Sequence, residues 1–285
     1  KKIKVMALSD LHLGEPEGLL YNNPPNILDI FVDKVSKIAK GGGGIEDGIE
    51  ELVLIGDIAD LSEAKPEDAY ANTMDFLKAL FKKVHVDKVV YIPGNHDHHL
   101  WVEMLESHYG KGYKECTPKT GVSINRPKPL MERCIPTDYK GGVEAYYPFY
   151  KVRIDNSIFL FDHGHLFSSF LNKQAGTVSC LEEIEEKTWE FMESIWFQGK
   201  KAPLFYRLRE MAYDWGRWAS LRVSHPTRGV SFKEDSTPVF DDGLRNGVIT
   251  YLEKMLKLSI YTDDLHLVFG HTHYGGRVLK DDRKI

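Results

Sequence analysis

Cysteine is scarce in this sequence. Its 285 residues include 3 cysteines, and no two of them form a Cys-x-x-Cys pair. An odd number of scattered cysteines does not provide a disulfide framework and is more typical of proteins from a reducing compartment. We therefore assign no catalytic role to Cys116, Cys134 or Cys180.

Long hydrophobic runs are also absent. No stretch of about 18 consecutive apolar residues occurs, which is roughly the length that a membrane-spanning helix requires. The first residues, Lys1 to Lys4, lead directly into an apolar strand-like segment rather than into the hydrophobic region of a signal peptide. Together with the cysteine usage, these features predict a cytoplasmic protein.

Positive charge is not in excess. The 37 Lys and Arg residues against 42 Asp and Glu residues give a formal net charge of −5. This balance argues against a protein that binds nucleic acids mainly by neutralising phosphates, although a local basic groove remains compatible with it. Hydrophobic residues make up 42% and charged residues 28%, which indicates a globular rather than a disordered chain.

Short apolar segments alternate with helical patterns in the first half of the sequence, as expected for βαβ units around a mostly parallel sheet. The helical pattern at 26–40 begins with the capping residue Asn26, and the pattern at 66–84 has Pro66 in its first turn. The apolar stripe expected to face the sheet in the second helix consists of Tyr70, Met74, Leu77 and Phe81. Strands are predicted at 3–9, 52–56 and 88–93.

The middle of the sequence is less regular. Between 110 and 147 the periodic patterns fade among Pro, Lys and Gly residues, which predicts an extended loop or a hairpin excursion. Strand patterns return at 148–153 and 157–162 around a turn at Asp155-Asn156.

A helical, aromatic-rich stretch occupies residues 166–242. We interpret it as a cap inserted into a core that is formed by residues 1–165 and 243–285. The aromatic residues of the cap are either its own packed interior or the lining of an apolar groove for substrate. In the second part of the core we predict a helix at 244–258 and a strand at 265–269.

Five short motifs rich in Asp, Asn and His stand where the predicted strands end. A single such motif is as often an ordinary turn, because Asp, Asn and Gly dominate turns. Five of them in series, each after an apolar strand, indicate a metal site instead, since ligands bind at the carboxyl ends of strands in open α/β sheets. Carboxylate, amide and imidazole donors without thiolate suit Mn²⁺, Fe²⁺ or Zn²⁺. The donors exceed what one ion needs, so we expect two divalent ions that share a bridging carboxylate. The predicted ligands are Asp10, His12, Asp57, Asn95, His163, His271 and His273.

These motifs resemble those of the calcineurin-like metallophosphoesterases. The matching residues are Asp10-x-His12, Gly56-Asp57-x-x-Asp60, Gly94-Asn95-His96-Asp97, His163-Gly164-His165 and Gly270-His271-x-His273. The resemblance implies a four-layer α/β/β/α sandwich with a dinuclear site at one edge. It further implies a first ion on Asp10, His12, Asp57 and His273, and a second on Asp57, Asn95, His163 and His271. Asp57 would then be the bridging carboxylate.

Two such ions can produce a bridging hydroxide near neutral pH and stabilise its in-line attack on phosphorus. His96 follows a predicted ligand directly and is the candidate general acid for the leaving oxygen, with Asp60 as its partner by resemblance. The alternative is that His96 only orients its loop. His98 and His99 either line the substrate entrance or begin a helix. His165 is the non-ligand histidine of its motif by resemblance, although an exchange of roles with His163 is conceivable.

The sequence therefore predicts a metal-dependent hydrolase of phosphomonoesters, phosphodiesters or pyrophosphates, acting on a small phosphorylated molecule with or without an apolar part. A cap at this position is similar to that of the bacterial enzymes that split UDP-2,3-diacylglucosamine, but His96 stands where the best-known branch of that group has Arg. Two alternatives remain, a pyrophosphohydrolase of such a lipid-linked nucleotide sugar and a non-catalytic scaffold that binds a partner through the cap.

Family sheets generally continue for another strand or two after the last motif, so we expect the natural chain to extend beyond Ile285.

Overall fold

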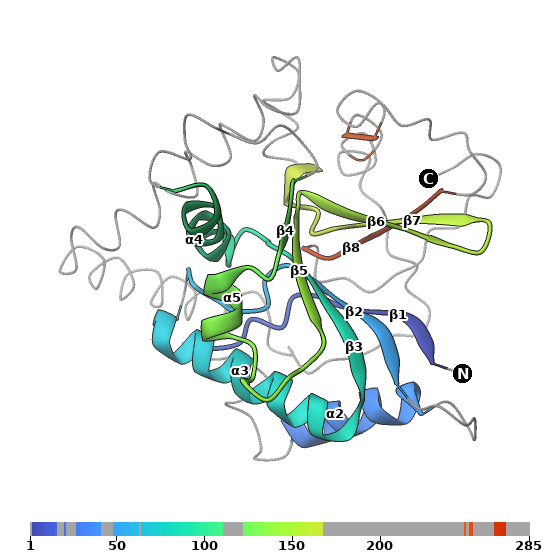
Figure 1. Ribbon diagram of the computed structural model, residues 1–285, viewed down its shortest axis with the longest axis horizontal. Coiled ribbons are helices and arrows are strands. Elements are labelled where there is room, and N and C mark those ends of the chain that lie inside the picture. The colour runs from blue at the N-terminus through green and yellow to red at the C-terminus, as the bar shows by residue number, and fades with distance from the viewer. Residues whose placement is uncertain are drawn as a thin grey trace, which may run out of the picture.

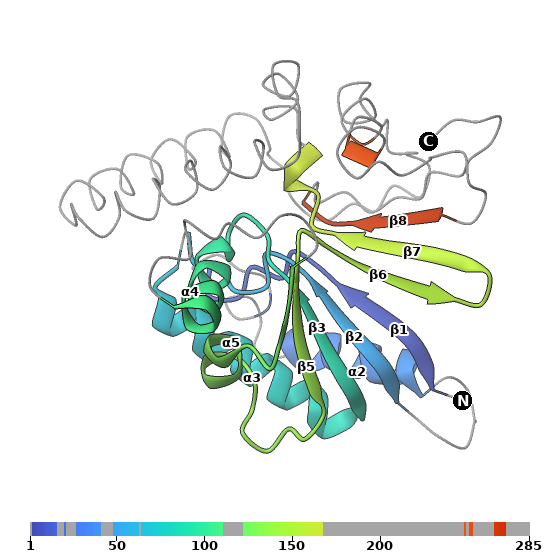
Figure 2. The same ribbon diagram turned by 45° about the horizontal axis from the view of Figure 1, so that its top comes forward.

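The computed structural model describes residues 2–15, 20, 27–40, 48–62, 64–110, 122–167, 248, 251–252 and 265–271. Within these ranges, two β-sheets lie face to face, and helices cover the outer face of the larger sheet (Figures 1 and 2). The α/β class predicted from the sequence is confirmed. The predicted cap lies outside the described residues, except for Leu166 and Phe167 at its start.

The larger sheet has five strands in the order β1-β2-β3-β5-β4. Strands β1, β2, β3 and β5 are parallel, and β4 is an antiparallel edge strand. The strands are β1 (Ile3–Leu8), β2 (Ile49–Ile55), β3 (Val86–Ile92), β4 (Val122–Asn125) and β5 (Gly142–Tyr147). The first three were predicted, although β2 and β3 begin earlier than expected.

The helices that cover this sheet are α2 (Ile27–Ala39), α3 (Pro66–Lys83), α4 (His98–Tyr109) and α5 (Lys128–Arg133). Helix α3 begins with Pro66 in its first turn, as predicted. Its buried face agrees with the predicted stripe only at Leu77: Ala69 and Phe76 are also fully buried, whereas Tyr70, Met74 and Phe81 are only partly buried. A Cβ atom at Gly14 would lie 2.5 Å from Cα of Ala69, so α3 approaches the backbone of the loop after β1 closely at Ala69.

The prediction of an extended loop or a hairpin excursion at 110–147 is wrong for residues 122–147, the part of this region after Gly110 that the structure describes. This region contains β4, α5 and β5, and β5 is a full member of the parallel sheet through its pairing with β3. Its burial alternates, with Val143, Ala145 and Tyr147 facing inward. A short alternating strand of this kind is stabilised by neighbours distant in sequence, so its local apolar signal is weak.

The second sheet has the order β6-β7-β8, with β6 (Phe149–Ile154), β7 (Ser157–Asp162) and β8 (Leu265–Phe269). The predicted hairpin around Asp155-Asn156 and the predicted last strand are both confirmed. Between the sheets, Val53 and Val90 pack against Tyr150 and Phe161, which joins the sheets through a common apolar core. Of the predicted helix 244–258, the described residues are 248 and 251–252. Among the helices that the structure describes, none has the length and apolarity needed to cross a membrane.

Strand register brings the predicted donors together. Leu8 pairs with Leu54, and Leu54 pairs with Tyr91, so β1, β2 and β3 end side by side. In the other sheet Asp162 pairs with Phe269. The backbone N–H of Gly270 donates a hydrogen bond of 3.1 Å to the carbonyl oxygen of His163. The ends of β7 and β8 therefore lie beside one another, with a predicted ligand loop after each.

Candidate metal centre

The loops after the strands adopt an unusual backbone conformation at the predicted ligands. Four of these residues have positive φ angles: Asp10 (53°), His12 (45°), Asp57 (51°) and His271 (66°). Residues other than glycine rarely adopt this left-handed region. Each instance costs on the order of 1 kcal/mol or more, so it persists only where the surrounding structure enforces it. Such backbone strain is frequent at functional sites. Here the four strained residues all have side chains that can bind a metal ion.

Asp57 and His163 form the most buried pair of the site. The Oδ2 atom of Asp57 lies 3.1 Å from Nε2 of His163, and both side chains are almost completely shielded from solvent. Burial alone would raise the pKa of Asp57, but the charge of His163 outweighs this effect and lowers that pKa far below its usual range. Burial likewise disfavours the charged form of His163, yet Asp57 raises its pKa to about 9.

The second ring nitrogen of His163 determines which atom faces the site. Nδ1 donates to the carbonyl oxygen of Ile55 at 3.1 Å, so Nε2 is the atom directed toward Asp57. Asn95 Oδ1 also lies 3.1 Å from the same Nε2. Two oxygen acceptors therefore converge on one imidazole nitrogen, an arrangement that requires a proton or a metal cation between them. The donor set fits a divalent cation on these grounds.

Asp10 and His12 complete a second group of donors around Asp57. Both Asp10 oxygens accept the backbone N–H of His271, at 2.9 and 3.1 Å, which ties the loop after β8 to the loop after β1. His12 Nε2 lies 3.9 Å from Asp57 Oδ2. The described residues contain three groups, each with its ligand atoms within 4.8 Å of one another, and two of the groups share Asp57: Asp10, His12 and Asp57; Asp57, His163 and His271; and His12, Asp60 and His96.

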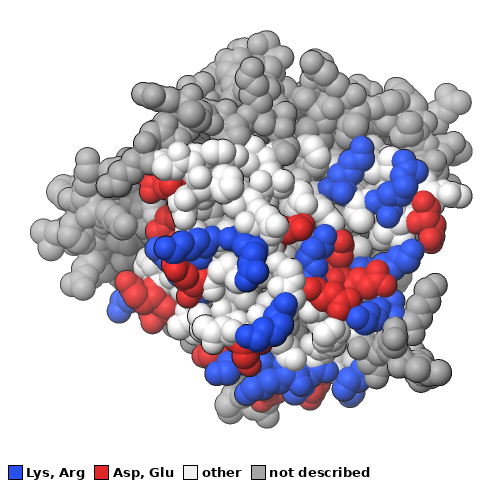
Figure 3. Space-filling model, in the orientation of Figure 1, with Lys and Arg blue, Asp and Glu red and all other residues white. Residues whose placement is uncertain are grey.

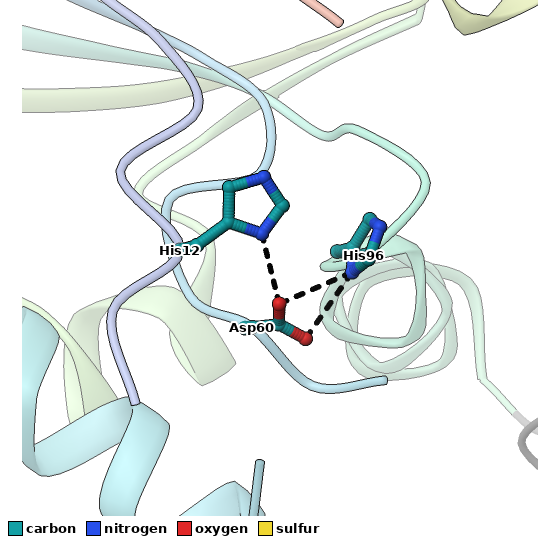
Figure 4. A group of neighbouring side chains, drawn as sticks. All are labelled: His12, Asp60 and His96. Carbon is teal, nitrogen blue, oxygen red and sulfur yellow. Dashed lines mark hydrogen bonds and ion pairs between the residues drawn. The ribbon is translucent and has the colours of Figure 1, made fainter. Parts of the chain in front are cut away.

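The third of these groups is held together by hydrogen bonds (Figure 4). Asp60 is fully buried, and its Oδ2 atom accepts Nδ1–H of His12 at 2.8 Å. The same carboxylate faces Nδ1 of His96 at 3.2 Å. Because Asp60 accepts Nδ1–H of His12, Nε2 of that ring is the nitrogen that faces Asp57. A carboxylate that holds the other ring nitrogen in this way commonly orients a metal-bound histidine. The sequence predicted the contact of Asp60 with His96 but missed its contact with His12.

His96 lies at the surface of this group. Its ring packs edge-on against His12 with 4.7 Å between the centroids, and its side chain is 24% exposed whereas Asp60 is fully buried. Its backbone N–H donates to Asp57 Oδ1 at 2.8 Å. His96 is therefore anchored through its backbone to the shared carboxylate, while its ring reaches toward solvent.

Other polar residues of these motifs have supporting roles. Asp97 is buried and accepts the backbone N–H groups of Gly94 (2.5 Å) and Ile58 (3.0 Å), so it fixes the loop, as expected. His98 is 2% exposed and begins α4, which excludes it from lining a substrate entrance. His165 is also buried, and burial lowers its pKa well below the usual value. Neither it nor His98 belongs to the three groups of candidate ligands found in the described ranges.

Sequence reasoning missed several residues that support the site. Asp162 accepts the hydroxyl of Tyr251 at 2.5 Å and the backbone N–H of Gly164 at 2.8 Å, which braces the loop that carries His163. Burial raises the pKa of Asp162 to about 6. A polar residue that ends an apolar strand was the available signal for Asp162, whereas nothing local to Tyr251 indicated its contact.

Two glycines allow the ligands to approach one another. A Cβ atom at Gly56, which has φ of +63°, would overlap the ring of His163. One at Gly94 would overlap Oδ1 of Asp57. These positions accept only glycine while His163 and Asp57 stay where they are.

Six of the seven predicted ligands lie in described parts of the chain, and the structure brings them together at the ends of β1, β2, β3, β7 and β8. His273 lies outside the described residues.

Comparison with curated proteins gives no significant match to the chain. The sequence model of the calcineurin-like phosphoesterase family matches residues 3–275. Members of this family typically bind two divalent metal ions, and the Asp and His groups described above can hold such ions. The chain therefore belongs to the calcineurin-like phosphoesterases and is a metal-dependent phosphate-ester hydrolase.

Proposed function

We propose that this protein hydrolyses small phosphate esters at a dinuclear metal centre, with in-line displacement at phosphorus. The observation that carries the proposal is the position of Asp57 in two groups of donors, one with Asp10 and His12 and the other with His163 and His271. Two groups of donors with one carboxylate in common suit two cations held close together.

In this proposal each ion has its own set of ligands beside the shared carboxylate. The first ion would be held by Asp10, His12 and Asp57, with His273 added by the family resemblance, and the second by Asp57, Asn95, His163 and His271. Their oxygen and imidazole donors suit Mn²⁺, Fe²⁺ or Zn²⁺, and Mn²⁺ is the first ion to test. When bound, such a pair of ions neutralises charge on the phosphate and makes water a nucleophile near neutral pH.

His96 is proposed as the general acid. Its Nδ1 atom faces Asp60, so Nε2 is the nitrogen available to give a proton to the leaving oxygen. The partial exposure of the ring supports this role, because a general acid must contact substrate. Asp60 contacts no substrate in this scheme, and it holds His96 and His12 in their orientations.

The surface favours a small substrate over a nucleic acid. On the face drawn in Figure 3, the described Lys and Arg side chains are interspersed with Asp and Glu and form no continuous basic stripe. Lys88, for example, lies 2.7 Å from Glu51. A phosphate backbone would require a basic track instead. We also propose a cytoplasmic location, in keeping with the low cysteine content and the free, buried Cys134.

A substrate panel tests this function. Purified protein loaded with Mn²⁺ would be assayed on an aryl phosphate, a bis-aryl phosphate and an aryl diphosphate, since the residues do not distinguish these classes. We expect turnover of at least one class, with Asp57→Asn inactive and His96→Ala slowed by about 10²–10⁴-fold. Protein that binds two ions yet hydrolyses none of the three classes would contradict the proposal and favour the scaffold alternative.

A further inference from the structure

Ser62 lies between Asp60 and His96, although no motif in the sequence indicated it. Its Oγ atom is 2.5 Å from Nδ1 of His96 and 3.1 Å from Oδ1 of Asp60. Its backbone N–H also donates to Oδ1 of Asp60, at 3.1 Å. The backbone contact alone would be an ordinary turn closed by an Asp side chain. The hydroxyl contact joins that turn to a residue 34 positions away in the chain.

The direction of these hydrogen bonds follows from the chemistry of the groups. An ionised carboxylate accepts only, so the Ser62 hydroxyl donates to Oδ1 of Asp60. The lone pairs of Ser62 Oγ are then available to accept Nδ1–H of His96. The other oxygen of Asp60 is already occupied by Nδ1–H of His12 at 2.8 Å. The direct contact from His96 to Asp60, at 3.2 Å, is longer than the contact from His96 to Ser62.

We propose that Ser62 is a positioning residue for the general acid: its hydroxyl oxygen accepts Nδ1–H of the doubly protonated His96 ring, so that Nε2–H is the proton directed toward the leaving group and Nδ1–H stays on the ring after that proton has been given. The proposal rests on the function proposed for His96. It explains how one buried carboxylate supports two imidazoles, because Asp60 holds His12 directly and holds His96 largely through Ser62. Loss of the Ser62 hydroxyl should therefore impair proton donation and leave the metal ligands in place.

Leaving-group dependence separates this role from a purely structural one. The phenyl and 4-nitrophenyl esters of whichever phosphate class the wild type hydrolyses would be compared in Mn²⁺-loaded protein. A poor leaving group needs the acid and a good one does not. We expect Ser62→Ala to lower kcat about 10–100-fold on the phenyl ester and less than about threefold on the 4-nitrophenyl ester, with KM unchanged. Ser62→Thr, which keeps the hydroxyl, should restore most of the rate.

A spectroscopic measurement tests the tautomer without turnover. Ring ¹⁵N chemical shifts of His96 in the full chain would report which nitrogen carries the proton. In the neutral ring, which is the form left after Nε2 has given its proton, we expect Nδ1–H in the wild type and in Ser62→Thr, and a mixture of tautomers in Ser62→Ala. Ser123→Ala, which removes an exposed hydroxyl from β4, is the matched control. Bound Mn²⁺ per chain and thermal unfolding should be the same in all these variants.

The outcomes distinguish this inference from the function on which it rests. If His96→Ala shows the leaving-group effect and Ser62→Ala does not, the inference is overturned while the general-acid role stands. If His96→Ala shows no such effect, His96 is not the general acid. The tautomer measurement then tests only whether Ser62 orients the His96 ring. An unchanged His96 tautomer in Ser62→Ala would overturn the positioning role in either case.

Discussion

The carboxylate of Asp57 and the imidazole of His163 meet at 3.1 Å, with exposed side-chain fractions of 1% and 0%. Burial disfavours a charged imidazole, but the carboxylate reverses this effect and raises the pKa of His163 to about 9. Without metal, a proton therefore occupies Nε2 of His163 at neutral pH. A metal ion that binds this nitrogen must displace that proton, so metal binding and protonation compete for one atom.

The first prediction concerns the pH dependence of the metal-free protein. His163 has an ordinary pKa of 6.5 in the unfolded chain and a raised one in the folded chain. Its ion pair therefore stabilises the fold fully below pH 6.5, down to the range in which Asp57 of the unfolded chain takes up a proton, at an ordinary pKa of 3.8. This contribution is lost as the pH rises through about 9. Chemical denaturation at several pH values should show this loss in metal-free wild type and a smaller loss in His163→Gln.

Metal binding should show the opposite trend. The apparent affinity for Mn²⁺ should increase as the pH rises from 6 toward about 9, with protons released on binding. Calorimetry in buffers of different ionisation enthalpy measures this release. An affinity for Mn²⁺ that does not change with pH, or proton uptake on binding, would contradict this assignment of His163.

The second prediction isolates the charge of Asp57. Asp57→Asn keeps the shape of the side chain but removes the charge that both donor groups share, so we expect it to lose binding of both ions. Asp155→Asn is a closely matched control, because Asp155 has φ of 53° against 51° for Asp57 but is 85% exposed in a hairpin turn. Metal analysis of the purified variants should find full occupancy only in the control.

The third prediction concerns the close approach at Gly56. Gly56→Ala would push a methyl group into the ring of His163 and should abolish the second ion, with a loss of thermal stability. Gly110→Ala carries a comparable positive φ, +87° against +63°, but its added methyl group meets no atom within 4 Å. Equal metal occupancy in the two variants would show that the approach of Gly56 to His163 has no part in the site.

Much of the site follows from the sequence because its ligands stand at the ends of apolar strands. Asp10, Asp57 and Asn95 each follow a strand whose apolar run is evident, and parallel pairing places these ends at one edge. Strand β5 escaped prediction because Val143 and Ala145 give only a short alternating signal. Its position depends on pairing with β3, which is 50 or more residues away in the sequence.

The supporting hydrogen bonds could not be predicted for a related reason. The contacts from Ser62 to His96 and from Tyr251 to Asp162 join residues 34 and 89 positions apart. Neither Ser62 nor Tyr251 stands in a recognisable motif, and serine and tyrosine occur throughout the sequence. The spatial relationship that gives them a role exists only after the strands have brought their loops together.

The fourth prediction separates Asp60 from Ser62. Asp60→Asn removes the buried charge that faces both His12 and His96, so it should weaken Mn²⁺ binding about 10–100-fold and also slow turnover. Ser62→Ala should slow turnover on poor leaving groups without weakening Mn²⁺ binding. Titration of Mn²⁺ into the two variants measures the difference. Equal Mn²⁺ affinities in both would exclude a direct role of Asp60 in holding His12.

The most direct test of the dinuclear centre is anomalous diffraction from crystals of the full chain soaked with Mn²⁺. We predict two peaks about 3.5–4 Å apart that share Asp57, one beside Asp10 and His12 and the other beside His163 and His271. A single peak among His12, Asp60 and His96, or no peak at Asp57, would contradict the account.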